Sequence, residues 1–383
     1  MHSKRNYYLL FFIAFLQGFV FYGPIATVYR QARGISIYEI FVIESISMVL
    51  QLIFEIPWGW FADRFGYKNT LLISYIVSFM SKIVFLKAVS FEWFLAERVL
   101  LVLSIAGISG CDTALLYNSI SREDSEKVFS RYNAVSVAGF LIASFSSTFI
   151  IGISMDLTVV LTIVSYGCAA LLAFFLEDIE AEAVERLKPL GSLKLALKDI
   201  NNLKFIFSIA LITEVSHSIT VFLNQLQYKS AGVGIRYYGI ILAVMQTISM
   251  LSAQSYRLTS RFGQGKVVKI AYGTIASGSI LLAFTGSAAL SILLIAVISG
   301  CTAVLIPISN DIQNKSITVA NRATILSAYA MIIDVTSSVA NLIIGKSANA
   351  SVQASFTVCG VISIAALLLG VSYFRTVEKS RAV

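Results

Sequence analysis

The chain has 383 residues, of which 57% are hydrophobic and 13% are charged. Soluble domains carry about a quarter charged residues, so this composition, with its mean hydropathy of +0.82, excludes a soluble protein and predicts an integral membrane protein. The formal net charge of +8 does not indicate nucleic-acid binding, because the basic residues lie in short segments between apolar runs. That distribution is typical of membrane topology.

Apolar runs of about 20 residues, enough for a helix to cross a bilayer, recur along the whole chain. Lys4 and Arg5 precede the first run as in a signal peptide, but the many runs that follow favour an uncleaved first helix. An even number of spans places both termini on one side of the membrane. The twelve predicted spans are 7–29, 37–61, 69–88, 91–117, 131–153, 156–176, 204–226, 236–256, 267–286, 288–310, 322–345 and 352–374.

The longest polar stretch, 178–203, divides these spans into two groups of six. It is rich in charge, with Arg186, Lys188, Lys194 and Lys198 among its residues. We therefore predict an N-terminal half over 1–177, a cytoplasmic linker over 178–203 that is partly an amphipathic surface helix, and a C-terminal half over 204–383.

The Lys and Arg residues of the loops predict the orientation. Most of them lie on the side of the linker, of the termini and of the turn between the second and third spans. Because cytoplasmic loops carry the excess of Lys and Arg, we expect a multi-pass protein of the cytoplasmic (inner) membrane with both termini in the cytoplasm.

No sequence motif indicates a metal, a cofactor or catalysis. The four cysteines lie in apolar runs without a C-x-x-C spacing, and neither a phosphate-binding P-loop nor an H-E-x-x-H motif occurs. We therefore predict no cofactor and no metal site, and a protein that is not an enzyme.

Two short motifs recur in the two halves. Ile108-Ser109-Gly110-Cys111 in the fourth span matches Ile298-Ser299-Gly300-Cys301 in the tenth, and Asp63-Arg64-Phe65-Gly66 has a weaker partner in Ser260-Arg261-Phe262-Gly263. The matches agree in span number and direction, so they predict two related halves. Internal repeats of this kind are common in secondary transporters.

The turn between the second and third spans carries Gly59, Asp63, Arg64, Gly66 and Lys68. It resembles the signature G-x-x-x-D-R/K-x-G-R/K-R/K of the major facilitator superfamily. The resemblance implies an all-α membrane protein with twelve transmembrane helices in two pseudo-symmetric six-helix halves. Arg98 in the fourth span is similar to the arginine of that family's second motif.

The chain departs from one subgroup of that family at two charged positions. The subgroup has E-x-P-T/S-G and S-G-A-x-E-A-L-x-Y-D-S, which are similar to the segments that contain Pro57 and Gly110. Tyr67 stands where the signature has a cation, and Asn118 stands where the subgroup has an acid. Because those two charges are plausible partners, we expect a weaker or rewired contact here.

The signature has two interpretations. In one it is a cytoplasmic latch, in which exposed charges worth about a few kcal/mol hold one state of the transporter. In the other it is a turn that only fixes topology. The candidate latch residues are Gly59, Asp63, Arg64, Gly66, Lys68 and Arg261.

Ionisable residues inside spans are costly and are candidates for function. Glu214 and His217 lie one helical turn apart in the seventh span and could form a proton-responsive pair; the alternative is an interhelical hydrogen bond of purely structural value. Glu44 and Asp334 are further candidates for proton coupling. Lys82 lies about two turns from the end of its helix, where we expect its amine to snorkel to the membrane surface.

Other polar and aromatic residues share the predicted cavity-facing sides of their spans. The resemblance places the first, fourth, seventh and tenth helices around a central cavity. Arg98 could bind an anionic group or hold a nearby carboxylate such as Glu97 or Glu44. The candidates for the substrate cavity are Gln17, Phe21, Arg98, Asp112, Asn224 and Gln225; a packing role is the alternative for the first two.

The sequence therefore predicts a secondary active transporter that works by alternating access, exporting a small amphipathic compound in exchange for protons. A proton-coupled importer, or a facilitator, is the alternative. The expected partners are a small-molecule substrate, protons and membrane lipids, without nucleic acid, and the chain is expected to act as a monomer.

Overall fold

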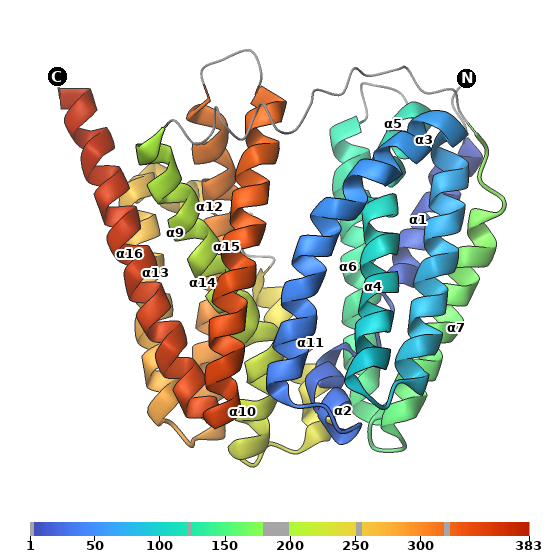
Figure 1. Cartoon of the computed structure of the whole chain (residues 1–383), viewed down its shortest axis with the longest axis horizontal. Helices are drawn as coiled ribbons and strands as arrows, with labels where there is room; N and C mark the ends of the chain where they lie inside the picture. Colours follow the sequence, from blue (N-terminus) through green and yellow to red (C-terminus); the bar gives the residue numbers. More distant parts are fainter. Residues whose placement is uncertain (1–3, 121–124, 179–198, 250–254, 318–321, 383) are drawn as a thin grey trace. The chain divides into compact units, whose positions relative to one another are not determined.

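The computed structural model describes residues 4–120, 125–178, 199–249, 255–317 and 322–382. Throughout these ranges the secondary structure is helical, with no strand. Contacts divide the chain into two compact units (Figure 1). Unit 1 comprises Met1–Ile35, Ile46–Glu185 and Ile235–Ala243, and unit 2 comprises Ser36–Ser45, Arg186–Gly234 and Val244–Val383.

Unit 1 is built from the first helices of the chain. They are α1 (Lys4–Gly18), the short η1 (Gly23–Ile25), α2 (Ala26–Ala32), most of α3 (Ile37–Lys87), α4 (Phe91–Ile108), α5 (Cys111–Ser119), α6 (Ser125–Ile150) and α7 (Met155–Ala173). Helix α3 bends sharply at Gly66, whose φ of 81° and ψ of 162° are not helical, so its two arms run antiparallel (Figure 1).

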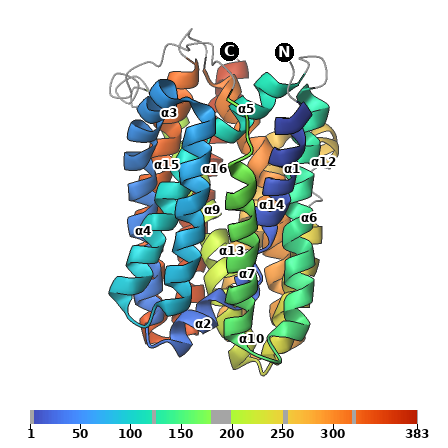
Figure 2. The same cartoon turned by 90° about the vertical axis from the view of Figure 1, so that its right-hand side faces the viewer.

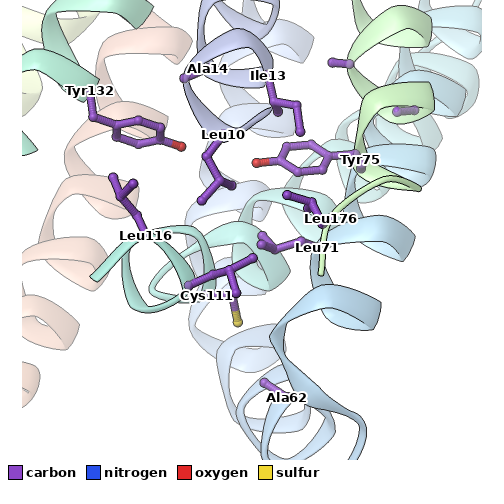
Figure 3. Close-up of a cluster of buried hydrophobic side chains, with 14 of the residues drawn as sticks. Leu10, Ile13, Ala14, Ala62, Leu71, Tyr75, Cys111, Leu116, Tyr132 and Leu176 are labelled. Atoms are coloured by element: carbon purple, nitrogen blue, oxygen red, sulfur yellow. The ribbon is translucent and has the colours of Figure 1, made fainter. Parts of the chain in front are cut away.

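Helix α1 is central to unit 1, packing against both α6 and α7 (Figure 2). Its crossing with α6 is close, because a Cβ on Gly18 would meet the backbone oxygen of Ser136 and one on Gly139 would meet that of Phe15. Small residues allow such backbone approach between membrane helices. Figure 3 shows the adjoining core, in which Leu10 of α1 lies between the rings of Tyr75 and Tyr132.

Unit 2 is built from the later helices. They are α9 (Ile200–His217), the π-helical η3 (Ser218–Leu223), α10 (Asn224–Ser230), the second part of α11 (Tyr238–Ser249), α12 (Ser255–Phe262), α13 (Gln264–Phe284), α14 (Ala288–Lys315), α15 (Arg322–Ala350) and α16 (Val352–Ala382). Helix α16 packs against α9, α13 and α15. The short η4 (Ile235–Tyr237) and the start of α11 belong to unit 1.

Ten helical segments of the described chain are long and apolar enough to cross a membrane. One of them, Ile37–Lys87, contains both the second and the third predicted span. The predicted span 236–256 runs into residues 250–254, outside the described residues, and α11 ends at Ser249. Each of the other nine predicted spans has its counterpart among these segments.

The boundaries of the two halves remain predictions. Most of the predicted linker, residues 179–198, lies outside the described residues, and so does the amphipathic helix expected there.

Candidate functional site

The first span is interrupted, and its interruption is held by side chains of α6 and α7. Helix α1 ends at Gly18, and helical structure resumes only at Gly23. Freed backbone groups at membrane depth must find other partners. The side-chain partners are Ser165 for the Leu16 carbonyl at 2.7 Å, Tyr166 for the Gln17 carbonyl at 3.1 Å, Thr162 for the Phe21 N–H at 3.0 Å and Ser147 for the Phe21 carbonyl.

Gln17 and Phe21 were both predicted to line the cavity. Gln17 lies in the last turn of α1, and Phe21 lies in the break that follows it. The Gln17 Nε2 atom is buried and donates no hydrogen bond within the described residues, and the Phe21 ring stacks on Phe19 with centroids 5.6 Å apart. Broken helices with unwound backbone are a recurrent feature of substrate sites in transporters.

A buried charged cluster lies beside this break. Lys82 of α3 is 2% exposed and Glu97 of α4 is 0% exposed. The Lys82 Nζ lies 3.8 Å from Glu97 Oε1 and donates to the Tyr22 hydroxyl at 3.2 Å. Arg30 of α2 is also buried, with Nη2 4.0 Å from Glu97 Oε2.

The prediction that Lys82 snorkels is wrong. Its amine is buried and points to Glu97 and to Tyr22, which come from other spans, so it is partnered inside the protein. The sequence reasoning also missed Arg30, which it placed in a loop, and considered Glu97 only as a partner for Arg98. A buried acid six residues into the fourth span was the available signal, since such an acid needs a cation.

Arg98 and Asp112, both predicted to line the cavity, lie on different helices of the fourth span. Arg98 is half-buried on α4. Asp112 follows a break between α4 and α5, where Gly110 has a φ of 80°. Its carboxylate accepts hydrogen bonds from the Tyr132 hydroxyl at 3.1 Å and from the Thr113 N–H at 2.7 Å, so Asp112 ties α5 to α6.

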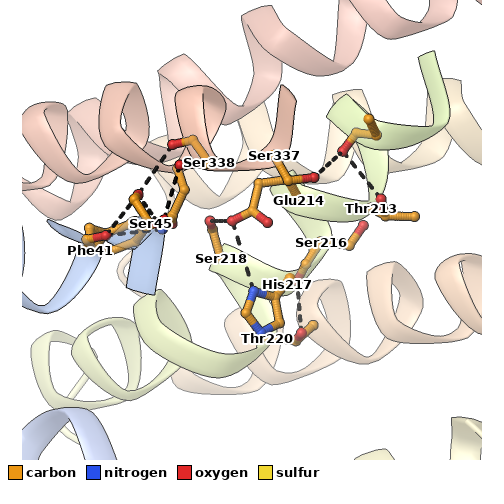
Figure 4. Close-up of polar contacts among 12 residues, drawn as sticks. Phe41, Ser45, Thr213, Glu214, Ser216, His217, Ser218, Thr220, Ser337 and Ser338 are labelled. Atoms are coloured by element: carbon orange, nitrogen blue, oxygen red, sulfur yellow. Dashed lines mark hydrogen bonds and ion pairs between the residues drawn. The ribbon is translucent and has the colours of Figure 1, made fainter. Parts of the chain in front are cut away.

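In unit 2, Glu214 and His217 lie next to each other near the end of α9 (Figure 4). Glu214 is 3% exposed. Its Oε1 accepts a hydrogen bond from Ser218 at 3.1 Å and lies 3.8 Å from His217 Nδ1. The imidazole of His217 is 39% exposed and meets the Phe222 ring edge-on at 5.4 Å.

The π-helix η3 begins immediately after His217. Such segments are rare and often mark functional sites. Asn224 donates to the Thr220 carbonyl at 2.6 Å, and Gln225 donates to the Val221 carbonyl at 3.2 Å. The two amide side chains predicted to line a cavity thus also satisfy carbonyl groups of the π segment.

Like Glu214, Glu44 is buried, and it lies in the part of α3 that belongs to unit 2. Next to it, Ser45 donates to the Ser338 carbonyl at 3.2 Å (Figure 4). Asn341 donates to the Phe41 carbonyl at 3.1 Å. Ser338 and Asn341 lie on α15. Asp334, the other predicted coupling residue, is half-buried on this helix.

The signature motif forms the bend of α3. Asp63 and Arg64 are exposed, and the Arg64 guanidinium lies over the Trp60 ring at 5.3 Å. Gly59 is buried and Lys68 is half-buried. Tyr67, which replaces a cation of the signature, packs against the apolar core of unit 1, so an aromatic contact stands where the charge is absent.

The weaker repeat has the same local geometry. Gly66 has φ 81° and ψ 162°, and Gly263 has φ 80° and ψ 147°. Arg64 lies over Phe65 at 5.6 Å, and Arg261 lies over Phe262 at 5.3 Å. The two turns are therefore structural counterparts.

Comparison with known proteins gives a family for this arrangement. The family model of the Major Facilitator Superfamily matches residues 7–341. The chain belongs to the Major Facilitator Superfamily. No curated protein matches the sequence.

Solved structures of other members of this superfamily share its fold at low sequence identity. The nucleoside transporter NupG is 16% identical, with a TM-score of 0.81 over 96% of this chain and 99% of that chain. A POT family transporter in complex with a thioalcohol-conjugated peptide is 14% identical, with a TM-score of 0.75 over 97% and 96%. A bacterial homologue of the human lysosomal transporter Spinster is 13% identical, with a TM-score of 0.73 over 98% and 97%. The protein is therefore a multi-pass membrane transporter of a small molecule.

Proposed function

We propose that the protein is a secondary active transporter that works by alternating access and exports a small amphipathic compound in exchange for protons. The observation that carries the proposal is the pairing of buried Glu214 with His217, which stands directly before the π segment. Both groups can exchange protons, and they are close enough to influence each other.

A buried charge is costly in a membrane helix. A carboxylate in a membrane helix is stabilised by hydrogen bonds and nearby positive charge, or it takes up a proton. Glu214 has Ser218 as a donor, and His217 supplies positive charge only when it is protonated. Proton uptake and release at this pair would therefore change the charge of unit 2, which a transport cycle can use.

Two further assignments belong to the proposal. The protein acts as a monomer in the cytoplasmic membrane. Both termini lie in the cytoplasm, because the Lys and Arg residues gather on their side of the membrane. The exposed charges of the bend at Gly59–Lys68 and of Arg261 form the cytoplasmic latch.

Proton-coupled import and facilitated diffusion are the alternatives. The broken helix of the first span does not favour one direction of flux. The family's antiporters carry a glycine-proline run in the fifth span, and the corresponding segment Ala134–Phe140 does not contain it. Coupling and direction are therefore separate questions that one experiment has to resolve.

The test is comparative metabolite profiling of cells and medium under an imposed pH gradient. Cells that produce the wild-type protein should redistribute at least one compound in a gradient-dependent way, towards the medium. Glu214→Gln, which removes the proton-binding carboxylate and keeps its shape, should abolish this dependence. Glu378→Gln, at an exposed acid near the end of α16, is the matched control and should behave as wild type.

Each alternative has its own result. Gradient-dependent accumulation inside the cells would establish import. Redistribution that ignores both the gradient and Glu214→Gln would establish a facilitator and refute the coupling.

A further inference from the structure

The buried cluster of Arg30, Lys82 and Glu97 has a charge balance that a purely structural ion pair does not need. Lys82 and Arg30 both face the carboxylate of Glu97, and the formal charges of these three buried side chains sum to +1. A single pair would hold these helices together at a lower desolvation cost. A net positive site at membrane depth favours an anion.

Glu97 fits the role of an exchangeable partner. Its two oxygens are buried and, within the described residues, accept no hydrogen bond. Its cations lie 3.8 and 4.0 Å away, whereas charge-assisted hydrogen bonds are about 2.7 to 2.9 Å long. The carboxylate is thus attracted by both cations but tightly bonded to neither.

Aromatic rings surround the Lys82 amine. Its Nζ lies 5.2 Å from the Tyr166 ring centroid and 5.8 Å from that of Tyr22. The Tyr22 ring stacks on Phe85 at 4.4 Å, and Arg30 lies over the same Phe85 at 5.3 Å. An apolar group attached to a carboxylate would therefore meet rings beside the cations.

The cluster is also connected to the interrupted first span. Tyr22, which accepts the hydrogen bond of Lys82, is the residue just before η1. Irregular backbone at membrane depth occurs where it is buried in protein or lines a water-filled cavity. The cluster therefore adjoins the irregular backbone of the first span.

We propose that Lys82 and Arg30 form the recognition site for a carboxylate group of the transported compound, which displaces Glu97 from the two cations. The proposal deepens the proposed function, because it defines the amphipathic substrate as an organic anion with an apolar or aromatic body. Glu97 then acts as an internal competitor that neutralises part of the site before the substrate binds.

Binding of simple probes to the purified full-length protein tests this proposal. The probes are sodium benzoate, its neutral isostere benzamide, and sodium chloride, each in chloride-free buffer; the readouts are calorimetric titration and the shift in melting temperature. Benzoate should bind and benzamide should not. Glu97→Gln should bind benzoate at least tenfold more tightly because the competing carboxylate is gone, a gain that misfolding cannot imitate.

The cation variants give the reverse result. Lys82→Gln should weaken benzoate binding at least tenfold, Lys82→Arg should retain it, and Lys87→Gln, at an exposed lysine on the same helix, should leave it unchanged. The proposal fails if benzoate binds neither wild type nor Glu97→Gln, or if Glu97→Gln weakens binding. It also fails if chloride alone gives the Lys82-dependent stabilisation and benzoate adds nothing.

These outcomes are independent of the test of proton coupling. If benzoate binding depends on Lys82 while flux ignores Glu214→Gln, the coupling is refuted and the anion site stands. If flux depends on Glu214 while benzoate does not bind, only the anion site is refuted.

Discussion

At Gly66 the backbone conformation requires a glycine. Its φ of 81° lies in the left-handed region that other residues avoid. A Cβ there would lie 2.8 Å from both carboxylate oxygens of Asp178. Gly263 has nearly the same backbone angles but open space around it. A substitution at Gly263 therefore tests the backbone strain alone, whereas one at Gly66 also tests the contact with Asp178.

Gly66→Ala should therefore destabilise the protein more than Gly263→Ala. Both variants incur the strain of a positive φ, about 1 kcal/mol or more, and the first also has to displace the exposed carboxylate of Asp178. Thermal unfolding of the purified variants measures the difference, and the double variant Gly66→Ala with Asp178→Ala should recover part of the loss. Equal losses at the two glycines would contradict the collision.

Residue-scale features were predictable from the sequence only where spacing decides them. Glu214 and His217 are neighbours because they lie one turn apart on one helix; their role in coupling stays a prediction. The surroundings of Lys82 depend on Tyr22 and Glu97, which other spans supply. A rule based on distance from the helix end cannot detect such partners.

At the scale of elements, two spans that were predicted as continuous helices are interrupted in the described structure. The first breaks between Gly18 and Gly23, and the fourth breaks at Ser109 and Gly110. The repeated motif makes the reason plain, since Ile298–Cys301 has the same residues as Ile108–Cys111 but lies inside the unbroken helix α14. Local sequence permits the break, and surrounding contacts decide it.

The break in the first span should depend on Thr162. Thr162→Val keeps the shape of the side chain but removes the acceptor of the Phe21 N–H, which leaves a polar group unsatisfied at a cost of about 1 to 3 kcal/mol. We expect a lower melting temperature than for Thr274→Val, whose hydroxyl donates to the Ile270 carbonyl of its own helix. If the two variants melt alike, the hydroxyl of Thr162 does not hold the break.

At the scale of the whole molecule, composition, the number of apolar runs and the signature motif predicted the fold correctly, and the family match confirms it. These features are repeated along the chain and do not depend on fine contacts. The substrate depends on a few side chains whose contacts come from different helices, as at Lys82. That is why the sequence specifies the architecture well and the cargo poorly.

The central claim is that substrate movement is coupled to protons through Glu214. The most direct measurement is proton movement across liposomes that contain the purified protein and a pH-sensitive dye, driven only by a gradient of the compound that profiling identifies. We predict that protons move opposite to the compound in wild type and do not move in Glu214→Gln. Compound flux without proton movement in wild type, or undiminished proton movement in Glu214→Gln, would contradict it.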